Sequence, residues 1–195
     1  NLKMEKLQMK KTNKYFFIKG IFFLISLIIN TPSFSNEMII GKEKISPGID
    51  IIFEGAVRDD IEPKGFYLNE DEADIHFEAL VTWSSNGPEG SIEGGFIPYL
   101  DIQVKIINQK TKEEGVYELI PHLNMSDNFH YANNLKLPGN KNDTYIVTFI
   151  ISPPKKGSIG FHFDWRKEVN DNLISKEIFL YKDLNFSKIA SQKRR

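Results

Sequence analysis

The amino-acid sequence predicts an all-β fold, an antiparallel β-sandwich that follows an N-terminal signal peptide. Apolar and polar residues alternate in several segments, and this period of two places successive side chains on opposite faces of a strand. Gly, Pro and Asn cluster between these segments, as at residues 86–90 and 138–140. Apolar residues repeat nowhere with a sustained period of 3.6, so helices should be few and short. Strands are expected at residues 48–57, 74–83, 97–107, 144–152, 158–165 and 175–184.

The N-terminal segment has the three parts of a secretory signal peptide. A lysine-rich lead precedes the uncharged apolar run at residues 20–29, and Ser33 and Ser35 supply the small residues of a cleavage site. The apolar run is shorter than the roughly 20 residues that span a bilayer, although an uncleaved membrane anchor is the alternative. We therefore expect residues 1–35 to be signal peptide and upstream residues, and residues 36–195 to form a single metal-binding domain in the periplasm.

Composition excludes several kinds of function. The 195 residues include no cysteine, which rules out disulfides, thiolate metal sites and iron–sulfur clusters. Lys and Arg number 25 against 26 Asp and Glu, and six of the lysines precede residue 36, so the rest of the chain is acidic. An acidic domain lacks the basic surface that nucleic-acid binding requires.

Histidines provide the candidate chemistry. His76 and Glu78 are two residues apart in an expected strand, so they project from the same face while Ile75 and Phe77 project from the other. An imidazole beside a carboxylate is half of a metal site, and it is also the ordinary pattern of an exposed strand face.

A second group lies between Pro121 and Tyr131. His122, Met125 and His130 combine imidazole with thioether, a ligand set that suits copper. Met125 could equally be a packing residue, which is the commoner use of methionine. His130 could equally be a loop histidine bonded to the backbone.

The fourth histidine, His162, lies between Phe161 and Phe163. In the expected strand it shares a face with Asp164, which could orient the imidazole ring as a hydrogen-bond acceptor. The alternative is an exposed polar face over an aromatic core. A weaker hypothesis is a carbohydrate groove with carboxylates near Trp83 and Tyr99, which rests on sequence proximity alone: Glu89, Glu93 and Asp101.

Five segments resemble the periplasmic iron-transport accessory proteins, a family that includes copper-binding, iron-regulated proteins and the thirty-four kilodalton membrane antigen. Residues 74–79 (DIHFEA) resemble the family's DIHLEA strand, and residues 95–100 (GFIPYL) its G-x-WIPYL segment. Residues 126–131 (SDNFHY) resemble its SDGPHYG loop, and residues 160–169 its GRHTDKETGV stretch. Residues 60–63 (DIEP) are similar to its DMEP segment. The order and spacing agree over roughly residues 38–170.

The resemblance implies an immunoglobulin-like β-sandwich that forms a homodimer and binds copper, with iron or manganese, near the dimer interface. It implies work beside an inner-membrane iron permease. By position, His76, Glu78 and His130 match family ligands, and His162 matches a histidine that reaches the site from the partner subunit.

One family ligand has no direct counterpart. The family places a methionine after a proline, where this chain has His122, so either His122 replaces that methionine or Met125 serves from a shifted position. A histidine there would favour cupric, zinc or ferrous ions over cuprous copper. Glu78 could be a direct ligand or could belong with Asp127 to an adjacent site for a harder ion.

Three function classes follow from these observations. The first is an accessory protein for ferrous iron uptake, which the sequence favours. The second, which the sequence favours less, is a metal-dependent redox enzyme of the ferroxidase kind at the same site. The third is a metal-free sandwich for adhesion or assembly.

Overall fold

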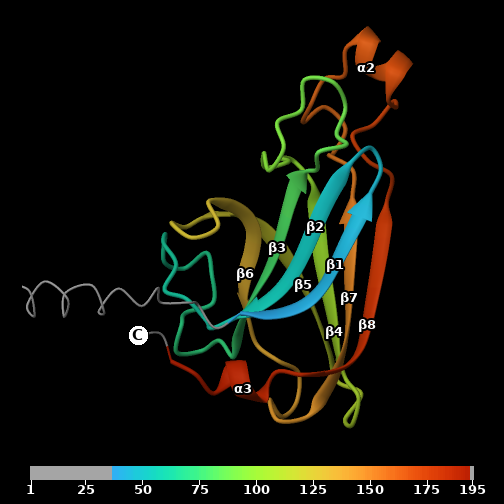
Figure 1. The fold of residues 1–195 in the computed structure, drawn as a ribbon. Coiled ribbons are helices and arrows are strands. Elements are labelled where there is room, and N and C mark those ends of the chain that lie inside the picture. The colour runs from blue at the N-terminus through green and yellow to red at the C-terminus, as the bar shows by residue number, and fades with distance from the viewer. Residues whose placement is uncertain (1–36, 194–195) are drawn as a thin grey trace, which may run out of the picture. The chain divides into compact units, whose positions relative to one another are not determined.

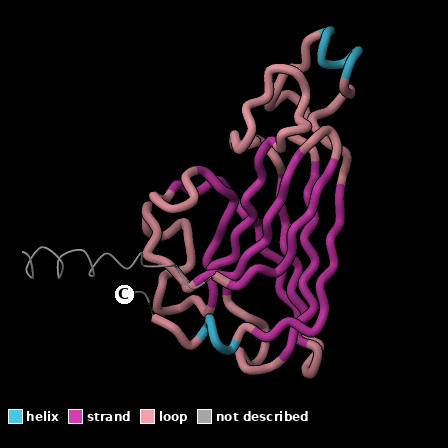
Figure 2. The backbone as a smooth tube through the Cα atoms, in the orientation of Figure 1, coloured by secondary structure: helices cyan, strands magenta, loops and turns pink. Residues whose placement is uncertain are grey.

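The computed structural model describes residues 37–193, so the expected signal peptide lies outside the described residues. Within them the chain forms eight strands and two short helices (Figures 1 and 2). In chain order these are β1 (Met38–Ile45), β2 (Ile49–Ala56), β3 (Ile75–Trp83), β4 (Asp101–Asn108), β5 (Glu114–Leu123), β6 (Phe129–Leu135), β7 (Thr144–Ser152), α2 (Phe163–Glu168), β8 (Glu177–Asn185) and α3 (Ser187–Ala190).

All strand pairs are antiparallel, in the order β1-β2-β3-β6-β5-β4-β7-β8. The sheet folds over so that its two edge strands, β1 and β8, approach each other and nearly close it (Figure 1). The Tyr181 hydroxyl of β8 donates a 2.7 Å hydrogen bond to Glu43 of β1. Gly41 makes this approach possible, because a Cβ at that position would overlap the Tyr181 ring.

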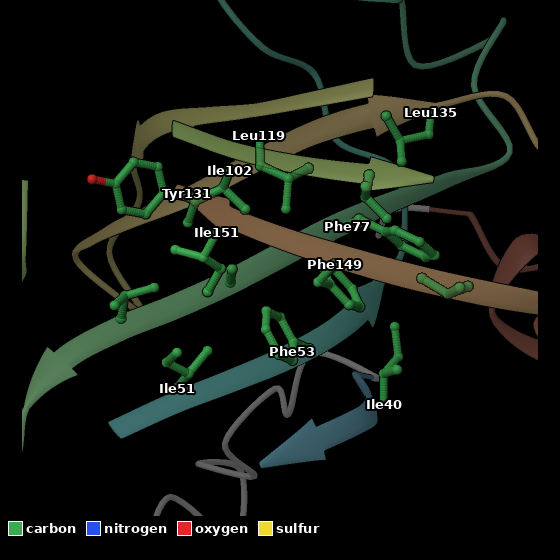
Figure 3. Close-up of a cluster of buried hydrophobic side chains, with 14 of the residues drawn as sticks. Ile40, Ile51, Phe53, Phe77, Ile102, Leu119, Tyr131, Leu135, Phe149 and Ile151 are labelled. Carbon is green, nitrogen blue, oxygen red and sulfur yellow. The ribbon is translucent and has the colours of Figure 1, made fainter. Parts of the chain in front are cut away.

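Apolar residues from the facing halves of the sheet fill the interior (Figure 3). Phe53 of β2 stacks on Phe149 of β7, with ring centroids 3.9 Å apart. Ile102, Val104 and Ile106 of β4 are fully buried while the residues between them are half-buried, which is the period-two pattern of the sequence. The expected all-β, immunoglobulin-like sandwich is confirmed.

One expected strand is wrong. Residues 158–165 form a loop that leads into α2, which begins at Phe163. The helix has an acidic first turn, a basic last turn that suits the helix dipole, and no β-branched residue. Two of the alternating aromatic residues pack on each other, since the Phe161 and Trp165 rings lie 6.2 Å apart, and Trp165 also meets Trp83.

The sequence also does not predict β1, β5 and β6, and β5 contains a proline that argues against a strand. No helix among residues 37–193 is long and apolar enough to cross a membrane.

Candidate metal centre

Three of the four histidines converge on the face of β3, β6 and β5 that points away from the core. His122 is the cross-strand partner of His130, and His76 lies on the neighbouring strand opposite Asn134. One ring nitrogen from each of these histidines lies within 4.8 Å of the others. Strand alternation places them on this face, because the flanking residues Ile75 and Phe77 point into the core.

The segment between β2 and β3 covers this cluster, so these side chains are shielded from solvent. His76 and His130 are only 4% and 1% exposed, and His122 is half-buried. The Tyr67 ring meets the His122 ring edge-on at 5.1 Å. A polar face that is buried in this way differs from the exposed strand face that was the alternative for His76.

Asn134 fixes the tautomer of His76. Its amide nitrogen donates to the carbonyl oxygens of Asp59 (2.7 Å) and Leu68 (2.9 Å), so its Oδ1 is the acceptor. His76 Nδ1 lies 2.9 Å from that oxygen and must therefore carry the proton. The lone pair of His76 is therefore on Nε2. This is the usual arrangement of a metal-binding histidine, in which one nitrogen is free for the metal and the other donates a hydrogen bond that orients the ring. Burial lowers the pKa of His76 to about 3, so the ring is neutral at pH 7.

His130 is oriented by a backbone carbonyl. Its Nδ1 lies 3.0 Å from the oxygen of Asn128, so Nδ1 donates and the Nε2 lone pair is free. Asn128 has a φ of 61°, a left-handed conformation that asparagine tolerates, and this turn places its carbonyl beside the ring.

His122 supplies an orphan nitrogen. Its Nε2 is buried and has no hydrogen-bond partner within the described part of the chain. Burial, together with the neighbouring His130, lowers the pKa of His122 to about 4, so it too is neutral at pH 7. Neutral imidazoles with free nitrogens are the form that binds transition metals.

Glu78 adds an oxygen to the three nitrogens. Its Oε1 lies 3.6 Å from His76 Nε2, and its Oε2 is buried with no partner among residues 37–193. Burial first, then the charges of Asp127, Glu37 and Glu54, raise the pKa of Glu78 to about 8. Glu78 and His76 are therefore mainly uncharged at pH 7 and do not form an ion pair. The donor set of three imidazoles and a carboxyl, with two orphaned atoms, fits a divalent transition metal.

The remaining sequence candidates lie in different places. Asp127 is half-buried, accepts a 2.7 Å hydrogen bond from Asn124, and is close enough to act on the Glu78 carboxyl. Met125 is fully exposed to solvent and is not part of the cluster.

His162 is the exposed N-cap residue of α2, and Asp164 accepts a hydrogen bond from the Trp165 amide instead of orienting His162. The structure thus brings together His76, Glu78, His122 and His130.

Sequence reasoning missed Glu54, Asn134 and Tyr67. Glu54 is the cross-strand partner of Glu78, is 6% exposed, and also has a buried Oε2 with no partner in residues 37–193. Burial and the adjacent Glu37 raise the pKa of Glu54 to about 7, against a smaller opposing effect of Lys42. Strand alternation could have revealed Glu54, because this acidic residue interrupts the apolar run of β2 and lies on the face opposite Phe53.

The residues suggested for a carbohydrate groove do not gather. A groove is lined by residues that include Phe96, Tyr99, Asp101 and Pro121, but its lining contains neither Trp83, Glu89 and Glu93 nor any residue of the histidine cluster.

Fold and site together define an antiparallel β-protein with a buried imidazole–carboxyl centre. The chain belongs to the family described as Fe2+ transport protein, whose model matches residues 34–187.

Among the relatives of known structure is FetP of uropathogenic Escherichia coli, 27% identical with a TM-score of 0.63 over 76% of this chain and 95% of that chain. Another is the copper-reconstituted P19 protein from Campylobacter jejuni, 29% identical with a TM-score of 0.63 over 75% of this chain and 94% of that chain. A UPF0423 protein of Brucella abortus is 25% identical over 72% of this chain and 77% of its own length.

Proposed function

We propose that this protein is a periplasmic metal-binding accessory protein that supports ferrous iron uptake. One observation carries the proposal: three imidazoles meet beside a buried carboxyl, and hydrogen bonds to Asn134 and Asn128 leave Nε2 as the free nitrogen of His76 and His130. Burying polar atoms without hydrogen-bond partners costs stability, so the unpaired His122 Nε2 and Glu78 Oε2 argue for a ligand at this site.

Copper is the first metal we assign to His76, His122, His130 and Glu78. Imidazole and carboxylate ligands suit cupric, ferrous and zinc ions, and copper ranks above the other divalent ions in affinity. The P19 relative is described in a copper-reconstituted form, which supports this order. His122, rather than the exposed Met125, takes the place of the family's methionine ligand. An imidazole in place of a thioether favours cupric over cuprous copper.

The link to iron and to the periplasm rests on family and sequence. Membership in the Fe2+ transport family supports a role in iron uptake, and we propose an inner-membrane iron permease as the partner. The lysine-rich lead with its apolar run supports export.

We further propose a homodimer in which His162 approaches the metal centre of the partner subunit. His162 is exposed on α2, and the apolar residues next to it and next to the cluster, Phe163, Leu123 and Phe129, are exposed as well. Association would bury these apolar side chains.

A calorimetric titration of the metal-free protein with copper, ferrous iron, zinc and manganese tests the proposal. His130→Ala should weaken copper binding by at least about tenfold, the lower end of what loss of an outer-shell group costs. Glu118→Gln, an exposed position on β5, is the matched control and should leave affinity unchanged. Unchanged copper affinity in His130→Ala would remove this histidine from the site.

A further inference from the structure

The covering segment, residues 57–74 between β2 and β3, shields the imidazole cluster from solvent. Its Tyr67 ring lies edge-on against the His122 ring, with centroids 5.1 Å apart. Its backbone carbonyls at Asp59 and Leu68 accept hydrogen bonds from the Asn134 amide. The position of this segment therefore sets how readily a metal ion reaches the imidazole nitrogens.

Arg58, at the start of the covering segment, is held by the C-terminal end of α3. Its Nη1 donates hydrogen bonds to the carbonyl oxygens of Ala190 at 3.2 Å and Gln192 at 2.9 Å. The last carbonyls of a helix have no partner inside the helix, and a basic side chain is a favourable donor to them. Figure 1 shows α3 and the covering segment at the same end of the sandwich.

Helix α3 is a firm support because it is embedded in the core. Phe186, Ile189 and Ala190 are at most 5% exposed, and the Phe186 ring meets the Phe77 ring at 5.2 Å. Movement of α3 would return this apolar surface to water, which is unfavourable. Arg58 thus ties the covering segment to a part of the molecule that resists displacement.

We propose that Arg58 and the end of α3 form a latch that holds the covering segment closed over the imidazole cluster, and so slows both capture and release of metal. The inference rests on the proposed metal centre, and it gives Arg58 a positioning role without making it a ligand. The carbonyls that Arg58 contacts lie beyond residue 187, where the match to the family model ends.

A continuous chain of hydrogen bonds joins the latch to the metal centre. Asp59, the next residue after Arg58, bonds the Asn134 side chain twice, through its N–H at 3.2 Å and its carbonyl at 2.7 Å. Asn134 Oδ1 in turn accepts the hydrogen bond from His76 Nδ1 at 2.9 Å. Contiguous networks of this kind can carry coupling between distant parts of a protein.

Arg58→Gln tests the latch kinetically, because it removes the guanidinium while leaving every proposed ligand in place. Loss of one charge-assisted hydrogen bond shifts an equilibrium by about tenfold, so copper release to a chelator in stopped flow should be about tenfold faster. Copper capture should become faster by a similar factor, because both steps pass through the open segment. The equilibrium affinity should then change less than either rate, whereas loss of a ligand or of an orienting group weakens affinity.

Hydrogen exchange of the metal-free protein measures the latch without any metal. Amides of residues 57–68 should exchange about tenfold faster in Arg58→Gln, while those of β4 keep their rates. Lys64→Gln is the matched control, because Lys64 pairs with Asp60 inside the covering segment, and both measurements should match the wild type. Arg58→Lys keeps a charged donor and should give intermediate values, which protects the test against misfolding of one variant.

The outcomes separate the two claims. Unchanged exchange of residues 57–68 in Arg58→Gln, or faster exchange with unchanged copper release, would overturn the latch and leave the proposed metal centre in place. Faster release without faster capture would also overturn the latch, because Arg58 would then act on the metal site itself. A folded wild type that binds no copper would overturn the proposed function and the latch together.

Discussion

Where residues 53–56 of β2 pair with residues 76–79 of β3, the sheet is buried on both faces, yet the two faces have opposite chemistry. The inner face presents Phe53 and Phe77, which pack against the rest of the core. The outer face presents Glu54, His76 and Glu78, which are equally inaccessible but leave two carboxyl oxygens without partners within residues 37–193. Apolar burial stabilises the fold, whereas unpaired polar burial costs free energy. The contrast indicates that the inner face maintains the structure and the outer face serves a ligand.

The largest expected effect comes from the inner face. Phe53→Ala removes a fully buried ring stacked on Phe149 and should lower the free energy of unfolding by about 3–5 kcal/mol. Urea unfolding followed by circular dichroism measures this loss.

Val116→Ala is the control for this change, because Val116 is 58% exposed and its loss should be small. Equal effects of the two substitutions would mean that the Phe53–Phe149 contact does not anchor the sandwich.

A smaller effect, on binding instead of stability, comes from Asn134. Asn134→Leu removes the acceptor that holds His76 Nδ1 and the two bonds to the covering segment, so copper affinity should fall about tenfold to a hundredfold. Asn134→Asp keeps an acceptor for His76 and should retain more affinity than the leucine variant.

Comparison of the two variants by competitive copper titration separates orientation of His76 from general packing. If the leucine variant bound copper as tightly as the wild type, Asn134 would not be a positioning residue.

The smallest effect is a pH dependence of the outer face. Glu78 has a pKa raised to about 8, so the folded metal-free protein holds a proton there that the unfolded chain, with a pKa near 4.5, releases. The stability contributed by this proton is present below about pH 4.5 and is lost as the pH rises to about 8.

Metal must displace the same proton, so copper affinity should increase between pH 7 and pH 8, by at most about tenfold. His76 and His122 do not contribute in this range because their pKa values are about 3 and 4. Calorimetry in buffers of different ionisation enthalpy counts the released protons. A pH-independent affinity, or the same slope in Glu78→Gln, would contradict a Glu78 ligand.

Strand periodicity predicted the parts of the site that lie in well-alternating strands. His76 and Glu78 share the expected face because β3 alternates clearly. Strand periodicity could not predict the convergence of His122 and His130, since it depends on the register of β5 with β6, two strands that the sequence did not predict. Their closeness in the sequence and the family resemblance were the only signals that grouped them. Glu54 was missed because its effect depends on a cross-strand partner 24 positions away along the chain.

At His162 the sequence predicted a strand that the structure does not form. Large apolar residues alternate at 159–165 as in a strand, but Phe161 packs on Trp165, Phe163 is exposed, and His162 lies at the start of a helix. A period of two predicts a shared face only where a neighbouring strand is available to pair with.

Pulsed EPR of the cupric protein tests the central claim most directly, because it detects the remote nitrogen of each imidazole bound to copper. We predict coupling to three imidazoles, reduced in His76→Ala and in His122→Ala. A spectrum without imidazole coupling, or one unchanged by both substitutions, would contradict a metal centre on the outer face of β3, β6 and β5.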